Sequence, residues 1–174
     1  IPCVRLIRSK NSRDTFLTYK IRVSAMSFTK VTYGLGSLGL IPFIVGLVLS
    51  AGQHDIVGIS GEVIFTTYSL AILCFLAGAV WGQILKVPFS QAHQRNLIVT
   101  NILVVIGWTA FLASQKFYAF SVTVLTLGFA GVFFLEFNLF KFSTTVQDRQ
   151  YARLRVILTS LVIAAHSGML VIHA

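Results

Sequence analysis

Long apolar runs separated by short charged segments dominate the chain from residue 31 onward. A helix needs about 20 apolar residues to cross the hydrocarbon layer of a membrane, and each run supplies roughly that number. The runs are continuously apolar and do not alternate as the strands of a membrane barrel do. The pattern therefore predicts five transmembrane helices, at Val31–Ala51, Val63–Leu85, Leu97–Ser114, Phe117–Leu135 and Val156–His173.

The connections between these runs are short, so consecutive helices are expected to pack as antiparallel neighbours in a compact bundle. Ser114–Lys116 leaves room only for a tight turn. The longest connection, from Glu136 to Arg155, is predicted to hold a short interfacial helix with its phenylalanines in the lipid. We predict an all-α polytopic membrane protein with two parts, a basic N-terminal arm (1–30) and a five-helix transmembrane domain (31–174).

Composition supports a membrane protein and excludes several soluble classes. Hydrophobic residues make up 56% of the 174-residue chain and charged residues 11%, whereas soluble domains carry about 25% charged residues. A soluble fold of this length would leave much apolar surface in water. A cytosolic enzyme, a nucleic-acid binder and a disordered tail are therefore not expected.

The charges are distributed unequally between the two sides of the predicted bundle. The formal net charge is +9, and the predicted helices place every Lys and Arg except Lys116 on the side of the N-terminus. Asp55 and Glu62 lie on the opposite side. The positive-inside rule then places the N-terminus in the cytoplasm or matrix and the C-terminus across the membrane.

The first 30 residues combine Arg and Lys with Ser and Thr, and Asp14 is their one acid. This composition is typical of a mitochondrial transit peptide or of the segment that follows one. The start at Ile1 fits a processed protein. Because such an arm buries too little apolar surface to order alone, we expect a partner subunit to hold it.

Glycines in the first apolar run form the pattern G-x-G-x-x-G at Gly34, Gly36 and Gly39. In dinucleotide-binding proteins this pattern follows a strand and opens a helix. Here it lies inside a transmembrane helix with no βαβ unit around it. We expect these glycines to allow close helix approach instead, and Pro42 to kink the helix.

A second small-residue pattern lies in the next run, where Gly78 and Gly82 form G-x-x-x-G beside Trp81. Gly46 and Ser50 have the same spacing. Small residues four apart let another helix backbone come close. The spacing does not decide whether these small residues pack within the bundle or against a partner protein.

The four histidines do not predict a metal or haem site. A pair of histidine ligands must lie at one depth on facing helices, and His54, His93 and His173 fall in different loops or at the end of the chain. His166 lies within a helix, where it is expected to pack and to bond a neighbour's carbonyl; a proton-transfer role is the alternative.

No catalytic group is predicted. Glu136 lies at the end of a run, so an interfacial or paired carboxylate is favoured over a proton relay. No Ser, His and acid are expected to share a depth, and an enzyme is not predicted. Cys3 and Cys74 are expected to be reduced structural thiols.

Basic residues on the N-terminal side are candidates for contact with anionic lipid such as cardiolipin. They are Lys86, Arg95, Arg149, Arg153 and Arg155. Topology alone also explains them, because orientation requires positive charge on this side. Beyond such a lipid, no cofactor is expected.

Three segments carry a family resemblance: Tyr33–Phe43 (YGLGSLGLIPF), Tyr68–Gly82 (YSLAILCFLAGAVWG) and Tyr151–Thr159 (YARLRVILT). From about Lys30 to the end, the chain resembles the transmembrane protein 69-like family. The resemblance implies a small polytopic domain of bacterial origin in mitochondria, and it brings no catalytic residues.

These observations lead to one functional expectation and one alternative. We expect a non-catalytic accessory subunit of a respiratory-chain assembly in the mitochondrial inner membrane, with its N-terminus in the matrix and its C-terminus in the intermembrane space. Its partners would be other subunits and membrane lipid, without nucleic acid. The alternative is a small transporter, channel or lipid-moving protein, in which Pro42 breaks the first helix at a substrate site.

Overall fold

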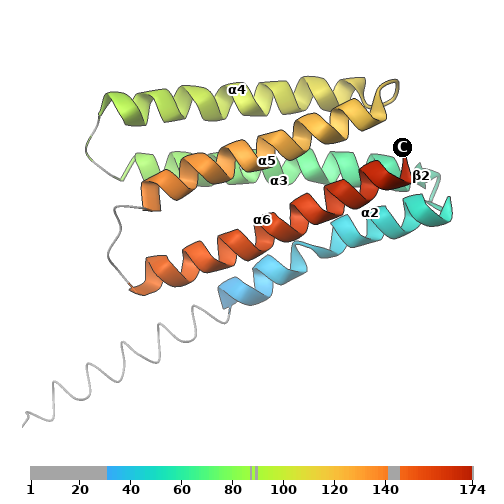
Figure 1. Ribbon diagram of the computed structural model, residues 1–174, viewed down its shortest axis with the longest axis horizontal. Helices are drawn as coiled ribbons and strands as arrows, with labels where there is room; N and C mark the ends of the chain where they lie inside the picture. The colour runs from blue at the N-terminus through green and yellow to red at the C-terminus, as the bar shows by residue number, and fades with distance from the viewer. Residues whose placement is uncertain (1–30, 87, 89, 141–145, 174) are drawn as a thin grey trace, which may run out of the picture. The chain divides into compact units, whose positions relative to one another are not determined.

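The structure is a computed structural model that describes residues 31–86, 88, 90–140 and 146–173, with the side chains of residues 140 and 146–149 left out. The predicted basic arm (1–30) lies outside the described residues. The elements are α2 (Ile41–Gly52), β1 (Asp55–Ile56), β2 (Ile59–Ser60), α3 (Gly61–Ile84), α4 (Gln91–Ala113), α5 (Tyr118–Phe140) and α6 (Val146–Ile172) (Figure 1).

Five stretches in the described part of the chain are long and apolar enough to cross a membrane. They are Val31–Gly52, Gly61–Ile84, Gln91–Ala113, Tyr118–Leu139 and Gln150–Ile172. The prediction of an all-α protein with five transmembrane helices in a compact bundle is therefore confirmed.

Several helices extend beyond the predicted limits. α4 begins at Gln91 rather than Leu97, and α5 continues to Phe140. The start of α4 is set by a cap, because the Ser90 side chain accepts a hydrogen bond from the His93 backbone at 3.2 Å. Charged residues end an apolar run but need not end a helix, whose backbone bonds continue into polar sequence.

The predicted interfacial helix between Glu136 and Arg155 is wrong. These residues belong instead to the end of α5 and to the start of α6, which begins at Val146. Residues 141–145, which lie between the two helices, are outside the described residues. The long polar stretch therefore extends two spanning helices and adds no separate element to the described part.

Helix α3 lies at the centre of the packing, since it contacts α2, α4 and α5, while α6 packs against α2 and α5. Leu73 of α3 illustrates the fit. A Cβ on Gly107 would lie 2.8 Å from a Leu73 methyl group and one on Gly128 3.0 Å from it. The core is built from Phe43, Phe65, Leu73, Val80, Ile84, Val122, Leu125, Phe129, Val132, Val162 and Met169.

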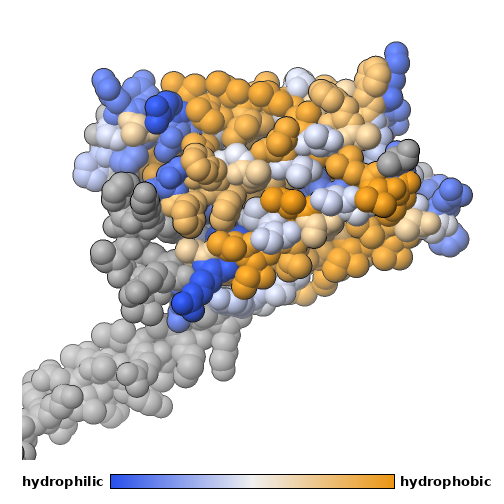
Figure 2. All heavy atoms as spheres, in the orientation of Figure 1, coloured by the Kyte–Doolittle hydropathy of each residue, from blue (hydrophilic) through white to orange (hydrophobic). Residues whose placement is uncertain are grey.

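The outer surface of the helices is apolar. Figure 2 shows hydrophobic residues across the middle of the viewed face and hydrophilic residues gathered at both ends. Large side chains such as Phe75 and Val171 are 70% and 78% exposed. In water this surface would be a large exposed apolar patch. The arrangement is that of a bundle that faces lipid.

The first spanning segment is interrupted near Pro42, as predicted. Residues 31–38 are helical, residues 39–40 form a turn, and α2 then begins with Pro42 in its first turn. Proline has no N–H and so breaks the backbone ladder. The Tyr68 hydroxyl of α3 donates a 3.0 Å hydrogen bond to the Gly39 carbonyl. The break is thereby joined to the neighbouring helix.

A two-residue hairpin joins α2 to α3, with Asp55 opposite Ser60 and Ile56 opposite Ile59. Val57 and Gly58 form its turn with φ of 55° and 75°. Positive φ at both turn residues is typical of a type I′ turn, which favours Asn-Gly. A β-branched residue is strained in this conformation. Hairpin pairing and the packing of the flanking helices therefore hold Val57 against its preference.

Replacing Val57 by asparagine should stabilise the protein by about 1 kcal/mol, because asparagine tolerates the left-handed conformation that valine resists. The measurement is the thermal unfolding midpoint of the purified protein in detergent. Ile59→Asn is the control, since Ile59 is half-exposed but does not have positive φ. An equal rise in both variants would contradict strain at Val57.

Candidate functional site

Two clusters of polar side chains lie near the two ends of the bundle, and other buried polar groups lie between them. We call the end with the β1–β2 hairpin, the α4–α5 turn and the end of α6 the hairpin end. The end with the starts of α4 and α6 is the basic end (Figure 1). Glu136 lies at the basic end and Glu62 at the hairpin end, with His166 between them along the bundle.

Glu136 is the centre of a buried network at the basic end, and it is 1% exposed. Its Oε2 accepts a 2.5 Å hydrogen bond from Arg155 Nε. Its Oε1 accepts from Gln83 Nε2 at 3.1 Å and from the Tyr151 hydroxyl at 3.2 Å. The paired alternative for Glu136 is the one observed, and the network joins α3, α5 and α6.

The predicted lipid-contact residues divide into separate groups. Arg155 is 6% exposed and its guanidinium faces Glu136, so this side chain serves the interior rather than the headgroups. Lys86, Arg95 and Arg153 are exposed, and their contact with lipid stays a prediction. The side chain of Arg149 lies outside the described residues. The sequence shows that Arg155 is charged, but it does not show whether the side chain faces the bundle interior or the lipid.

His166 is fully buried in a ring of phenylalanines. Its ring centroid lies 4.8 Å from that of Phe65, 5.3 Å from Phe129 and 5.7 Å from Phe43. Nδ1 is 2.8 Å from the Val162 carbonyl, which lies one turn earlier on the same helix and not on a neighbouring one. Nε2 has no hydrogen-bond partner among the residues that the structure describes. No group of three metal-ligating side chains occurs in that same part.

At the hairpin end, Ser50, Glu62 and His173 meet, although they lie on α2, on α3 and after α6. Ser50 Oγ donates to Glu62 Oε1 at 2.7 Å and is 2.8 Å from His173 Nε2. His173 Nε2 is 3.3 Å from Glu62 Oε1. The expectation that no Ser, His and acid share a depth is therefore wrong. The predicted helix ends already put all three residues on the side opposite the N-terminus, whereas the contact between their side chains depends on how the helices pack.

The arrangement nevertheless differs from a catalytic triad. In a triad the serine proton goes to one histidine nitrogen and the acid holds the other. Here Ser50 gives its proton to Glu62, and both oxygens face the same nitrogen, Nε2 of His173. Ser50 has one proton to donate, so it is not activated by His173. The cluster ties the end of α6 to α2 and α3.

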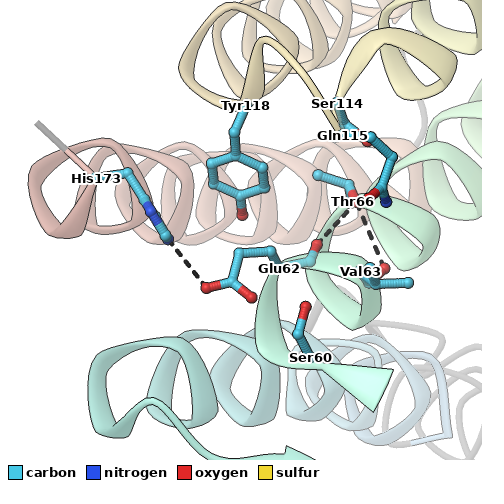
Figure 3. A pocket seen from close by; sticks show the side chains of 8 residues that line it. All are labelled: Ser60, Glu62, Val63, Thr66, Ser114, Gln115, Tyr118 and His173. Carbon is cyan, nitrogen blue, oxygen red and sulfur yellow. Dashed lines mark hydrogen bonds and ion pairs between the residues drawn. The ribbon is translucent and has the colours of Figure 1, made fainter. Parts of the chain in front are cut away.

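A cavity of about 230 Å³ lies beside this cluster. Figure 3 shows the Tyr118 hydroxyl pointing toward Glu62 from one side and the Ser60 hydroxyl from the other. The Tyr118 ring packs on His173 with centroids 4.5 Å apart. Its hydroxyl is buried without a hydrogen-bond partner in the described part of the chain. The lining residues are Ser60, Glu62, Val63, Thr66, Ser114, Gln115, Tyr118 and His173.

The predicted packing residues of the first run lie in different surroundings. A Cβ on Gly36 would lie 2.8 Å from a Leu158 methyl group, so Gly36 faces α6. Gly34 is exposed, and Gly39 is half-buried with its carbonyl bonded to Tyr68. A close approach of two backbones involves Gly46 and Gly61 instead. A Cβ on Gly61 would lie 2.6 Å from the Gly46 carbonyl oxygen.

The G-x-x-x-G pattern of α3 faces away from the bundle. Gly78 and Gly82 are exposed, and a Cβ on either would meet nothing within 4 Å. Trp81, between them, turns inward and donates from Nε1 to Thr100 Oγ1 of α4 at 3.1 Å. The sequence left open whether these glycines pack within the bundle or against a partner. Within the described bundle, no helix packs on them.

The comparisons with known proteins give a family but no individual relative. No curated protein and no solved structure matches the chain. A family model described as a protein of unknown function, DUF3429, matches residues 28–171. This match includes the first four spanning segments, the fifth except its last residue, and the Glu136 network, while His173 of the hairpin-end cluster lies beyond it. The chain therefore belongs to the DUF3429 family.

Proposed function

We propose that the protein is a non-catalytic subunit of a larger membrane assembly, whose α3 face takes a helix of a neighbouring subunit. The observation that supports this proposal is the exposed stripe of Gly78 and Gly82, where nothing in the described chain lies within 4 Å of an added Cβ. Exposed small residues let a second backbone approach closely in lipid. Cys74 is exposed one turn earlier on the same helix.

The polar contacts of the interior also favour a structural role. The Glu136 carboxylate is bonded to Arg155, Gln83 and Tyr151, and the Glu62 carboxylate to Ser50 and His173. Both sets cross between helices and hold them together. Buried polar groups that are satisfied in this way rigidify a bundle. A rigid bundle that exposes the Gly78 and Gly82 stripe to a neighbouring helix is consistent with a scaffold role in an assembly.

The setting belongs to the same proposal. The resemblance to the transmembrane protein 69-like family and the basic arm support the mitochondrial inner membrane, and a respiratory-chain assembly is the one we propose. The positive-inside rule supports an N-terminus in the matrix and a C-terminus in the intermembrane space. Exposed Lys86, Arg95 and Arg153 would then meet anionic lipid on the matrix side.

The native Cys74 allows a direct test in isolated mitochondria. With Cys3 replaced by serine, a thiol-reactive photo-crosslinker on Cys74 should capture one defined neighbour, and the product should comigrate with a respiratory complex on blue-native gels. Gly78→Leu should prevent capture by filling the stripe. Thr109→Leu, at an exposed site on α4, is the control. Migration of the wild type as a small free species would overturn the subunit role.

His166 favours the transport alternative, because it lies in the span between the Glu136 and Glu62 clusters and its Nε2 has no partner in the described chain. Ionisable groups within a membrane span often mark proton pathways. Purified protein in liposomes should then carry protons, and His166→Phe should abolish the flux. Absence of flux in the wild type would leave the subunit role as the one proposal.

A further inference from the structure

We infer that the cavity at the hairpin end is a binding site for a primary ammonium group. The cavity joins a carboxylate, an amide and several hydroxyls from different elements, among them Glu62, Gln115, Ser60 and Tyr118. Figure 3 shows Glu62 between Tyr118 and Ser60, with Gln115 farther away beside Thr66. The inference concerns a different face from the Gly78 stripe and does not depend on the subunit role.

The charge of the lining favours a cation. Among the lining residues that the structure describes, Glu62 is the one acid and there is no lysine or arginine. The nearby Lys116 instead lies over the Phe117 ring, 5.5 Å from its centroid. Glu62 lies in the first turn of α3, where the helix dipole stabilises a negative charge. An anionic ligand would meet this carboxylate and be repelled.

The size of the cavity argues against a bare metal ion. Holding one water molecule takes only about 10–15 Å³ of such volume, whereas the cavity measures about 230 Å³. Glu62 and His173 are also the only two residues of the lining that commonly bind metals, and no metal-ligating group of three occurs among the described residues. The cavity therefore fits an organic molecule of several heavy atoms.

The hydrogen-bonding groups match the three N–H donors of an ammonium. Glu62 Oε1 already bonds Ser50 and His173, but a carboxylate has about four acceptor positions. The Tyr118 hydroxyl is buried without a partner in the described chain, and a buried hydroxyl costs free energy until it is bonded. A bound ammonium would donate to both. A quaternary ammonium has no N–H and would satisfy neither.

The ammonium group has two potential sources that share this chemistry. One is the headgroup of an ethanolamine lipid, because the residues that line the cavity lie at the start of α3, in the α4–α5 turn and at the end of α6, where the spanning helices end. The other is a small free amine from the aqueous phase. The experiment below separates the two sources and tests the chemistry that they share.

The test uses the full purified chain in detergent micelles, titrated with ethanolamine and monitored by its thermal unfolding midpoint and by calorimetry. We expect saturable binding of ethanolamine, and binding of choline or Na⁺ that is weaker by at least about tenfold, because neither cation has an N–H to donate and each lost charge-assisted hydrogen bond costs about that factor. No saturable effect of ethanolamine, or equal effects of all three cations, would overturn the inference.

Tyr118→Phe is the decisive variant, because it removes the unpartnered hydroxyl and keeps the ring on His173. It should weaken ethanolamine binding about tenfold while the protein stays folded. Tyr33→Phe, the same change at an exposed position outside the cavity, is the matched control. Glu62→Gln should also lose binding. Unchanged affinity in Tyr118→Phe would refute the site, even if Glu62→Gln failed to fold.

The same ethanolamine titration in lipid nanodiscs distinguishes the two sources of the ammonium group. If the lipid headgroup fills the cavity, nanodiscs of phosphatidylethanolamine should block the ethanolamine titration and those of phosphatidylcholine should not. If a free amine is the ligand, ethanolamine should bind equally in both. Either result supports the ammonium site. Loss of ethanolamine binding in both kinds of nanodisc would show that the binding seen in micelles is an effect of detergent, and it would overturn the inference.

Discussion

Gly61→Ala should destabilise the bundle by about 3 kcal/mol, because the added methyl group meets backbone rather than side chains. A Cβ there would lie 2.6 Å from the Gly46 carbonyl oxygen and 3.0 Å from the Leu49 carbonyl carbon, and it would also collide with the Ser50 amide nitrogen. Overpacking of a fitted contact costs about 1–3 kcal/mol, and backbone atoms have the least room to yield. α2 and α3 would have to separate.

The measurement is the midpoint of unfolding by heat or by SDS in mixed micelles. Gly82→Ala is the matched control on the same helix, since nothing lies within 4 Å of its added Cβ. Alanine there should be neutral or should stabilise α3 by up to about 1 kcal/mol through its higher helix propensity. Equal effects at both glycines would show that the close approach of α2 and α3 is not what fixes the bundle.

Glu136→Leu should cost about 3–5 kcal/mol, the loss expected when one partner of a buried ion pair is removed. The Arg155 guanidinium would stay buried, at 6% exposure, without its carboxylate. Gln83 and Tyr151 would lose their acceptor as well. The readout is the same unfolding midpoint, compared with that of Arg155→Met and of the double variant.

The double variant separates a costly orphaned charge from a stabilising pair. Glu136→Leu with Arg155→Met should be less damaging than Glu136→Leu alone, because apolar replacement of a whole buried pair is often neutral. Arg153→Met is the control, since this arginine is exposed, and it should change stability by no more than about 0.5 kcal/mol. Additive losses in the double variant would contradict coupling of the two groups.

The two end clusters show where prediction from the sequence stopped. Glu136 and Arg155 are each visible as charges beside an apolar run, and the sequence favours an interfacial or paired Glu136. It does not predict that the partner is Arg155, which was expected to contact lipid. Ser50 and His173, 123 residues apart, form one contact. Depth along a helix can be estimated from the sequence, whereas the helix that a side chain faces depends on packing.

The small-residue patterns show the same limit. G-x-x-x-G at Gly78 and Gly82 has the spacing typical of close helix contact, yet the bundle closes at Gly46 and Gly61 instead. Spacing fixes which residues share a helix face but not the direction of that face. No glycine lies four residues before or after Gly61, so the sequence pattern does not mark this residue. Its role in the close contact of α2 and α3 is visible only from its position opposite α2.

The sequence by itself determined five membrane-spanning helices, because a lipid layer accepts only long apolar segments that satisfy their own backbone hydrogen bonds. Tertiary structure alone decided the rotation of each helix and thus which polar groups pair, which glycines touch and where a cavity stays open. The physical reason is that the ability of a segment to cross lipid depends on the summed hydrophobicity of its own residues. A contact between side chains depends on the relative positions of at least two segments.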